Sequence, residues 1–171
     1  MKWYRRLCGA LDALYTASGV LAALFLIAIL LLIMAQMIAR WTGLVFSGAA
    51  DYAGYCMAAA SFLAFSHALN RGAHIRVSIL LNALGKRRYW LEIWCFVIGA
   101  MASSYLAWYA VRATMWSHKF NDISQGQDAT PLWIPQSGMA LGSVLLALCF
   151  WDNVLRLLIL KKHAIETETV D

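Results

Sequence analysis

The side chains that could carry out chemistry are few in this sequence and lie far apart. The four cysteines form no CxxC pair and show no Cys/His ligand spacing, so we interpret them as small packing residues. A haem or quinone site would need two histidines at one depth of a membrane. His67 and His74 belong to the predicted inner side, His118 to the outer side and His163 to the C-terminal tail.

Charged side chains are also absent from the places where a carrier would need them. Pumps and transporters keep ionisable groups inside their membrane spans, where such groups are costly and usually functional. Here every Asp, Glu, Lys and Arg lies at or beyond the end of a predicted span. The sequence also lacks a pair of short, Gly/Pro-broken spans that would indicate inverted repeats. We therefore predict no catalytic, cofactor-binding or metal-binding residue, no enzyme activity and no self-sufficient carrier.

The elements around these residues are predicted to be membrane helices. The chain has 171 residues, of which 62% are hydrophobic and 13% charged, whereas soluble domains carry about 25% charged residues. Four uncharged runs of 27, 19, 19 and 23 residues separate the charged ones, and a spanning helix needs roughly 20 apolar residues. The fold class is therefore all-α integral membrane, a single domain over residues 1–171. The four spans are expected at about 14–39, 52–70, 93–111 and 135–155.

Basic residues orient these spans. Of the 14 Lys and Arg residues, 11 flank the N-terminus, the connection between spans two and three, and the C-terminus. Only Arg40, Arg112 and Lys119 fall on the other side. By the positive-inside rule, both termini are predicted to be cytoplasmic. The net charge of +5 is thus a topology signal and does not indicate a nucleic-acid partner.

The connection between spans two and three has the pattern of an amphipathic helix at the membrane surface. Apolar residues repeat at helical spacing over about 75–85, while basic residues flank both ends. Cations in such a helix lie among lipid headgroups. The alternative is a solvated basic loop with an accidental periodicity. The predicted anchor residues are Arg71, Gly72, His74, Arg76, Lys86, Arg87 and Arg88. The tail at about 162–171 is charged and is predicted to be disordered.

Small residues recur one turn apart within the spans. In lipid, small side chains let helix backbones approach each other closely. We predict helix-packing positions, within this chain or against a partner, at Gly54, Ala58, Ser61, Gly99, Ser103, Gly138 and Gly142.

The longest polar interval on the outer side joins spans three and four. Asn121-Asp122 and Gln125-Gly126 supply turn residues. Span four is expected to begin at Pro135, after an extended apolar segment over 131–134. Asp51 is expected to cap the start of span two.

Three motifs of this chain carry a resemblance to a known family. The first is Arg40-Trp41 followed by Asp51-Tyr52. The second is the RGAHIRV sequence at 71–77. The third combines Asp122-Ile123-Ser124 with PLWIPQ at 131–136. Together these motifs resemble those of the small (DctQ-type) membrane subunit of tripartite ATP-independent periplasmic (TRAP) transporters. The resemblance covers about 11–158, although the family more often has Tyr and Glu where Trp41 and Asp51 stand.

This resemblance implies a role that composition cannot give. It implies a multi-pass protein of the bacterial inner membrane that acts as a non-catalytic scaffold for a large transport subunit. That large subunit, not this chain, would bind sodium, and a periplasmic binding protein would deliver an organic acid. Residues expected to help dock the binding protein are Asp122, Ser124, Gln125, Asp128 and Trp133. Two alternatives stay open: the outer loop merely links two spans, or the chain is a generic membrane anchor of another complex, such as a respiratory enzyme.

Overall fold

Four long helices make up the computed structural model, which describes residues 2–44, 46–71, 88–126 and 128–160. They are α1 (Lys2–Thr42), α2 (Ala49–Asn70), α4 (Arg88–Phe120) and α5 (Trp133–Leu160). Each contains one of the four predicted spans and extends past it at one end or both. The predicted all-helical architecture is therefore confirmed for the described part of the chain.

Three of these helices are long and apolar enough to cross a membrane. The candidate spans are Cys8–Thr42, Ile93–Phe120 and Trp133–Leu158. α2 has 22 residues, which is about 33 Å of helix and sufficient in length. By length and composition together, however, α2 is not among the candidate spans. The prediction that α2 is a fourth span, like the predicted orientation, stays a prediction.

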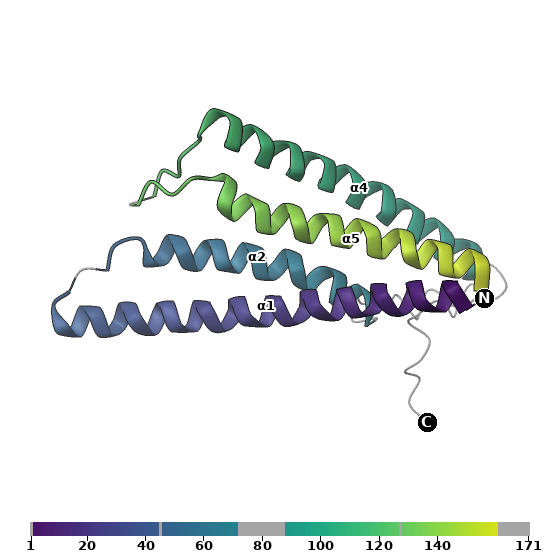
Figure 1. Ribbon diagram of the computed structural model, residues 1–171, viewed down its shortest axis with the longest axis horizontal. Coiled ribbons are helices and arrows are strands. Elements are labelled where there is room, and N and C mark those ends of the chain that lie inside the picture. The colour runs from purple at the N-terminus through teal and green to yellow at the C-terminus, as the bar shows by residue number, and fades with distance from the viewer. Residues whose placement is uncertain (1, 45, 72–87, 127, 161–171) are drawn as a thin grey trace, which may run out of the picture.

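The helices form a row in which chain order and spatial order differ. α1 packs on α2, α2 packs on α5, and α5 packs on α4. Figure 1, viewed down the shortest axis, shows the four helices side by side as a layer. α4 and α1 are thus the edge helices, and α2 and α5 lie between them.

The two helices of each hairpin, α1 with α2 and α4 with α5, run in opposite directions, whereas the neighbours α2 and α5 run in the same direction. The layer therefore has two distinct ends. We call the end where α1 turns into α2 and α4 turns into α5 the hairpin end. The opposite end, where α1 and α4 begin and α2 and α5 finish, is the terminal end (Figure 1). The residues predicted to form an interfacial helix at 75–85, and the tail at 162–171, lie outside the described residues.

Apolar and small side chains hold the layer together. Ala22 of α1, Leu63 of α2 and Leu145 of α5 form one buried cluster. Tyr15, Leu69 and Cys149 join the same three helices nearer the terminal end. Because lipid solvates apolar surface, the drive to pack such helices comes from close contact and hydrogen bonds rather than from burial of apolar area.

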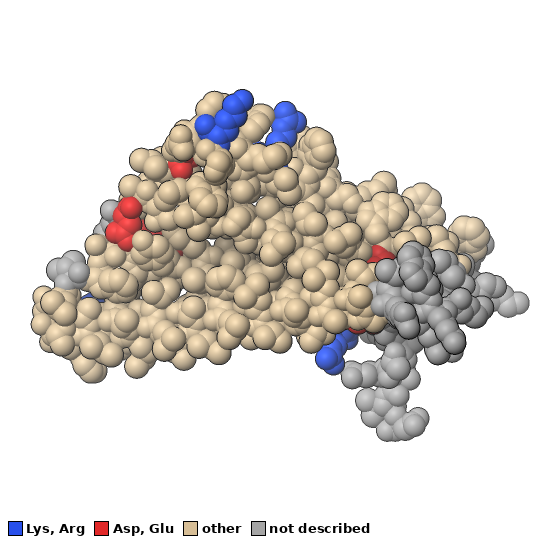
Figure 2. Space-filling model, viewed as in Figure 1, with Lys and Arg blue, Asp and Glu red and all other residues tan. Residues whose placement is uncertain are grey.

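Charged side chains leave the middle of the layer free. Figure 2 shows a broad face whose middle is almost without Lys, Arg, Asp or Glu, with acidic side chains visible toward both ends of the layer. Many large apolar side chains on α1 and α4 point outward, such as Leu31 at 63% and Tyr105 at 67% exposure. Such a surface suits lipid or another membrane subunit.

Two predicted helix starts differ from those observed. α2 begins at Ala49 with Gly48 as its N-cap residue, so the prediction that Asp51 is the cap is wrong. Gly48 has a φ of 82°, a conformation that glycine adopts without strain, and this places the turn three residues earlier. α5 begins at Trp133 rather than Pro135. Proline is tolerated there because the first four N–H groups of a helix have no partner within it.

Candidate functional site

The connection between α4 and α5, described over residues 121–126 and 128–132, is a structured loop that we call the hairpin loop. Its two arms pair antiparallel at Ile123 and Pro131. The Ser124 N–H donates to the Thr130 carbonyl at 2.8 Å, and the Leu132 N–H donates to the Asp122 carbonyl at 2.9 Å. These backbone hydrogen bonds give the loop a fixed shape.

The hairpin loop is fastened to the start of α2. The Tyr55 hydroxyl donates to the Ser124 hydroxyl at 2.5 Å, and the Gly126 N–H donates to the same oxygen at 3.2 Å. The Ser124 hydroxyl therefore links the hairpin loop to α2 by hydrogen bonds.

Two carboxylates lie at the same contact. The Asp128 carboxylate lies against the Gly48 backbone, and the Asp51 carboxylate lies against the Gly126 backbone, so closely that a β-carbon on either glycine would collide with it. Acidic groups are stabilised at a helix N-terminus, where free N–H groups and the helix dipole carry positive charge. The two aspartates thus hold loop and helix together from opposite sides.

The predicted docking residues take different positions on this loop. Asp122, Gln125 and Asp128 are exposed, and Ser124 is half-buried at the contact with α2. Trp133 is 38% exposed, and its ring packs edge-on against His118 at 5.3 Å between centroids. The loop therefore exposes the side chains of Asp122 and Gln125, whereas the side chains of Ser124 and Asp128 contact α2 or the residue before it.

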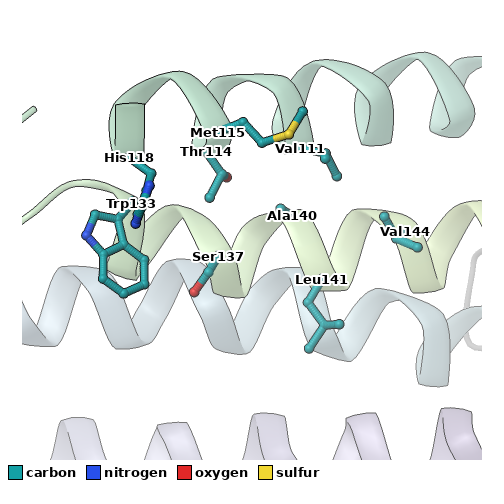
Figure 3. Close-up of a pocket in the computed structure, with 9 residues that line it drawn as sticks. All are labelled: Val111, Thr114, Met115, His118, Trp133, Ser137, Ala140, Leu141 and Val144. Carbon is teal, nitrogen blue, oxygen red and sulfur yellow. The ribbon is translucent and has the colours of Figure 1, made fainter. Parts of the chain in front are cut away.

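An apolar groove of about 510 Å³ lies beside the hairpin loop, between α4 and α5. Figure 3 shows His118 and Trp133 together at one end of this groove and Val111 and Val144 toward the other. Thr114 and Ser137 add hydroxyl groups, but the lining is otherwise apolar. Among the residues that line this groove, His118 is the only titratable one, and the lining supplies no second acid, base or charged group to work with it.

The predicted packing residues divide between the inside and the outside of the layer. Gly138 and Gly142 of α5 face α2, where added β-carbons would lie 3.0 Å from Ala59 Cβ and 2.5 Å from the Phe62 carbonyl carbon. Gly99 of α4 faces the Phe150 ring of α5. Ser103, also on α4, is buried and donates to the Ala100 carbonyl at 3.1 Å.

The predicted positions on α2 instead face outward. A β-carbon on Gly54 would meet no described atom within 4 Å. Ser61 is exposed and donates back to the Met57 carbonyl at 2.9 Å, and Ala58 is half-buried. Of the predicted surface anchor, Arg71 is the exposed residue that ends α2, and α4 begins at Arg88. The anchor residues between them, Gly72, His74, Arg76, Lys86 and Arg87, lie outside the described residues.

Sequence reasoning missed a polar cluster at the terminal end. Arg156 pairs with Asp152 at 2.8 Å, as the spacing of four residues predicts. It also pairs at 2.9 Å with Asp12 of α1, which lies 144 residues away in the sequence. One turn deeper, the Ser18 and Ser66 hydroxyls are hydrogen-bonded at 2.8 Å. The sequence does contain a pattern that indicates such a cluster, because polar residues recur at helical spacing in α1 and α5. That pattern does not predict which helices meet.

Comparison with known families decides the class of this protein. The model of one family, the DctQ component of tripartite ATP-independent periplasmic transporters, matches residues 29–160. The chain belongs to this family. No curated protein and no solved structure matches it.

As a DctQ component, the chain is a multi-pass membrane protein and not an enzyme. The family assignment replaces the alternative of an anchor for a respiratory enzyme. Within the described residues, no group of three His, Cys, Asp or Glu side chains could hold a metal ion. The functional surfaces of this DctQ component must therefore be sought among its contacts rather than in a catalytic centre.

Proposed function

We propose that this DctQ component is the fixed scaffold subunit of a sodium-coupled TRAP transporter in a bacterial inner membrane. It supports the large transport subunit and helps dock a periplasmic binding protein that delivers an organic acid. The hairpin loop faces the periplasm, and both termini face the cytoplasm.

The single observation that carries the docking role is the attachment of the hairpin loop to α2. A mere linker between two helices needs no fixed shape, and surface loops are usually mobile. This loop is instead tied to α2 through Tyr55 and Ser124 and through the contacts of Asp51 and Asp128. A preformed loop loses less conformational entropy on binding, which favours contact with a partner.

The layer of helices supports the scaffold role. A row of four helices exposes two broad apolar faces, whereas a compact bundle would hide much of that surface. The outward face of α2 carries Gly54, Ala58 and Ser61, which leave room for the backbone of another helix. This face is the candidate contact for the large subunit. Residues 71–88 would anchor the scaffold to lipid headgroups.

The docking role can be tested by changing Asp122, whose side chain is exposed and whose backbone N–H and carbonyl both make hydrogen bonds that shape the loop. Asp122→Lys reverses the charge, and Asp122→Asn removes it with little change in shape. A charge pair at the rim of an interface contributes up to about 1 kcal/mol, which corresponds to about a fivefold change in affinity.

The measurement is solute uptake by reconstituted vesicles at a limiting concentration of binding protein. We expect Asp122→Lys to lower the rate about two- to fivefold and Asp122→Asn to lower it less. Raising the concentration of binding protein should restore the rate, and the large subunit should still co-purify with both variants. Equal uptake by wild type and Asp122→Lys at limiting binding protein would show that the loop does not dock it.

A further inference from the structure

A group of polar side chains lies inside the terminal end of the helix layer, where three helices meet. We call it the polar node. Its members come from α1, α2 and α5, and they are Asp12, Tyr15, Asn70, Asp152, Asn153 and Arg156. Cys149 lies between Tyr15 and Asn153: it packs against the Tyr15 side chain, and its Sγ atom lies 3.6 Å from Asn153 Nδ2.

The charged members of the polar node are joined directly. The Arg156 Nη2 atom lies 2.9 Å from Asp12 Oδ1 and 2.8 Å from Asp152 Oδ2. Asn70 Nδ2 approaches the same Asp12 oxygen at 3.5 Å. The Asp12 carboxylate is therefore the point at which α1, α2 and α5 meet.

Four other polar atoms of the polar node are buried without a hydrogen-bond partner in the described part of the chain. They are Tyr15 Oη, Asn70 Oδ1, Asn153 Oδ1 and Arg156 Nε. Tyr15 and Asn153 are fully buried, and Arg156 is 7% exposed. Buried polar groups are nearly always hydrogen-bonded, so four exceptions in one place require a common explanation.

The orientation of both asparagine amides is fixed by their nitrogen atoms. Asn153 Nδ2 donates to the Cys149 carbonyl at 2.8 Å, and Asn70 Nδ2 points at the Asp12 carboxylate. Both amide oxygens are therefore true unpaired acceptors, whereas the Tyr15 hydroxyl and the Arg156 Nε–H are unpaired donors.

Two donors and two acceptors match the hydrogen-bonding capacity of water. A metal cation could not accept the Arg156 N–H and would be repelled by the guanidinium. An anion would face the carboxylates of Asp12 and Asp152. We propose that the polar node is a binding site for ordered water, which links α1, α2 and α5 through Tyr15, Asn70, Asn153 and Arg156. The 45% exposure of the Asp12 side chain gives water a way in.

This site explains how the chain keeps two acids and an arginine within helices long enough to span a membrane. Buried water typically makes about three hydrogen bonds to groups that the protein leaves unpaired. The bound water supplies the polar contacts that apolar neighbours such as Leu69 cannot. It therefore fastens the first helix of the chain to the last at the terminal end of the layer.

The first test is radiolytic labelling of the full chain in lipid nanodiscs in ¹⁸O-labelled water. Hydroxyl radicals formed from bound water modify neighbouring side chains even when these are buried. Leu63, which is 1% exposed in an apolar cluster, is the dry control. After correction for intrinsic reactivity, we expect Tyr15 to take up ¹⁸O several times faster than Leu63. Equal rates would overturn the proposal.

The second test is the thermal stability of Tyr15→Phe, which removes only the hydroxyl. If water binds that hydroxyl, its loss should lower Tm by about 2–4 °C, the effect of one net hydrogen bond in a chain of this size. If the hydroxyl is simply unpaired, its removal should leave Tm unchanged or raise it, and either result would overturn the proposal. Tyr105→Phe is the control for loss of an exposed hydroxyl: Tyr105 lies on the outer surface of α4 beside Tyr109, where its hydroxyl is not enclosed by the protein. Replacing sodium with choline should change neither variant, and a sodium-dependent Tm shift that is lost in Tyr15→Phe would identify the ligand as a cation instead.

Discussion

The contact between α2 and α5 at Gly142 provides the sharpest test of the helix order. A β-carbon at this position would lie 2.5 Å from the carbonyl carbon and 2.7 Å from the carbonyl oxygen of Phe62. Non-bonded carbon atoms prefer a separation of about 3.5–4.0 Å. Because the obstacle is backbone, Gly142→Ala would force the two helices apart by about 1 Å.

The cost follows from this displacement. Overpacking a well-packed contact costs about 1–3 kcal/mol, and each kcal/mol lowers Tm by about 2–4 °C in a chain of 150–250 residues. We therefore expect Gly142→Ala to lower Tm by about 2–12 °C. The destabilisation should extend beyond the contact at Gly142, because separation of α2 and α5 also opens the nearby cluster around Leu63 and Leu145.

Three other glycines serve as graded controls on the same chain. At Gly138 the added β-carbon meets Ala59 Cβ at 3.0 Å, a closer contact than real β-carbons normally make. At Gly99 it meets the far edge of the Phe150 ring, which can rotate away. At Gly54 it meets no described atom. The expected order of destabilisation is therefore Gly142→Ala, then Gly138→Ala, then Gly99→Ala, with Gly54→Ala near zero or stabilising.

The assay can use the thiol of Cys149, which is fully buried among α1, α2 and α5. With Cys8, Cys56 and Cys95 replaced by alanine, a fluorogenic maleimide reports the opening of this core on heating in lipid nanodiscs. A Gly142→Ala variant as stable as Gly54→Ala would refute the close approach of α2 and α5, and with it the order of the helices in the layer.

Two further predictions concern the two ends of the layer. Arg156→Met should destabilise the chain by about 3–5 kcal/mol, because it leaves the buried Asp152 unpaired. Asp12→Asn should destabilise the chain by about 1 kcal/mol or less, because Arg156 still pairs with Asp152 and the Asp12 side chain is 45% exposed. If the Cys149 thiol became equally accessible to the maleimide in both variants, this reasoning would be contradicted. At the hairpin end, Tyr55→Phe removes the hydrogen bond to Ser124, worth about 0.5–1.5 kcal/mol. Amide hydrogen exchange of the hairpin loop should then be faster, and unchanged exchange would show that the loop does not depend on α2.

The sequence by itself determined the elements of this protein. Uncharged runs bounded by charged residues predicted four spans, and each predicted span lies within a longer helix. Such runs predict helices reliably, because a membrane accommodates long apolar helices and excludes backbone N–H and C=O groups that have no hydrogen-bond partner. The motifs at 71–77 and 131–136 carried the resemblance to the family, which the match over 29–160 then established. The starts of α2 and α5 were predicted less exactly, because they depend on the local backbone conformation at Gly48 and around Pro135.

Only the tertiary structure decided which faces of these helices meet. In water, the apolar side of a helix identifies its core-facing side. In a membrane, the helix faces toward lipid and those toward protein are both apolar, so the apolar pattern does not predict which face packs on another helix. Gly54 and Gly142 therefore look alike in sequence, yet one faces outward and the other lies against Phe62.

The same reason applies to the polar contacts at the two ends of the layer. The pair of Asp152 and Arg156 follows from a spacing of four residues, which places both side chains on one side of a helix. The pairing of Arg156 with Asp12 depends on α1 and α5 lying together, and no local pattern encodes that. Likewise, Ser124 meets Tyr55 only because α5 packs on α2 and brings the hairpin loop with it. Spacing along the chain determines contacts within one helix, and the packing of the helices determines all the others.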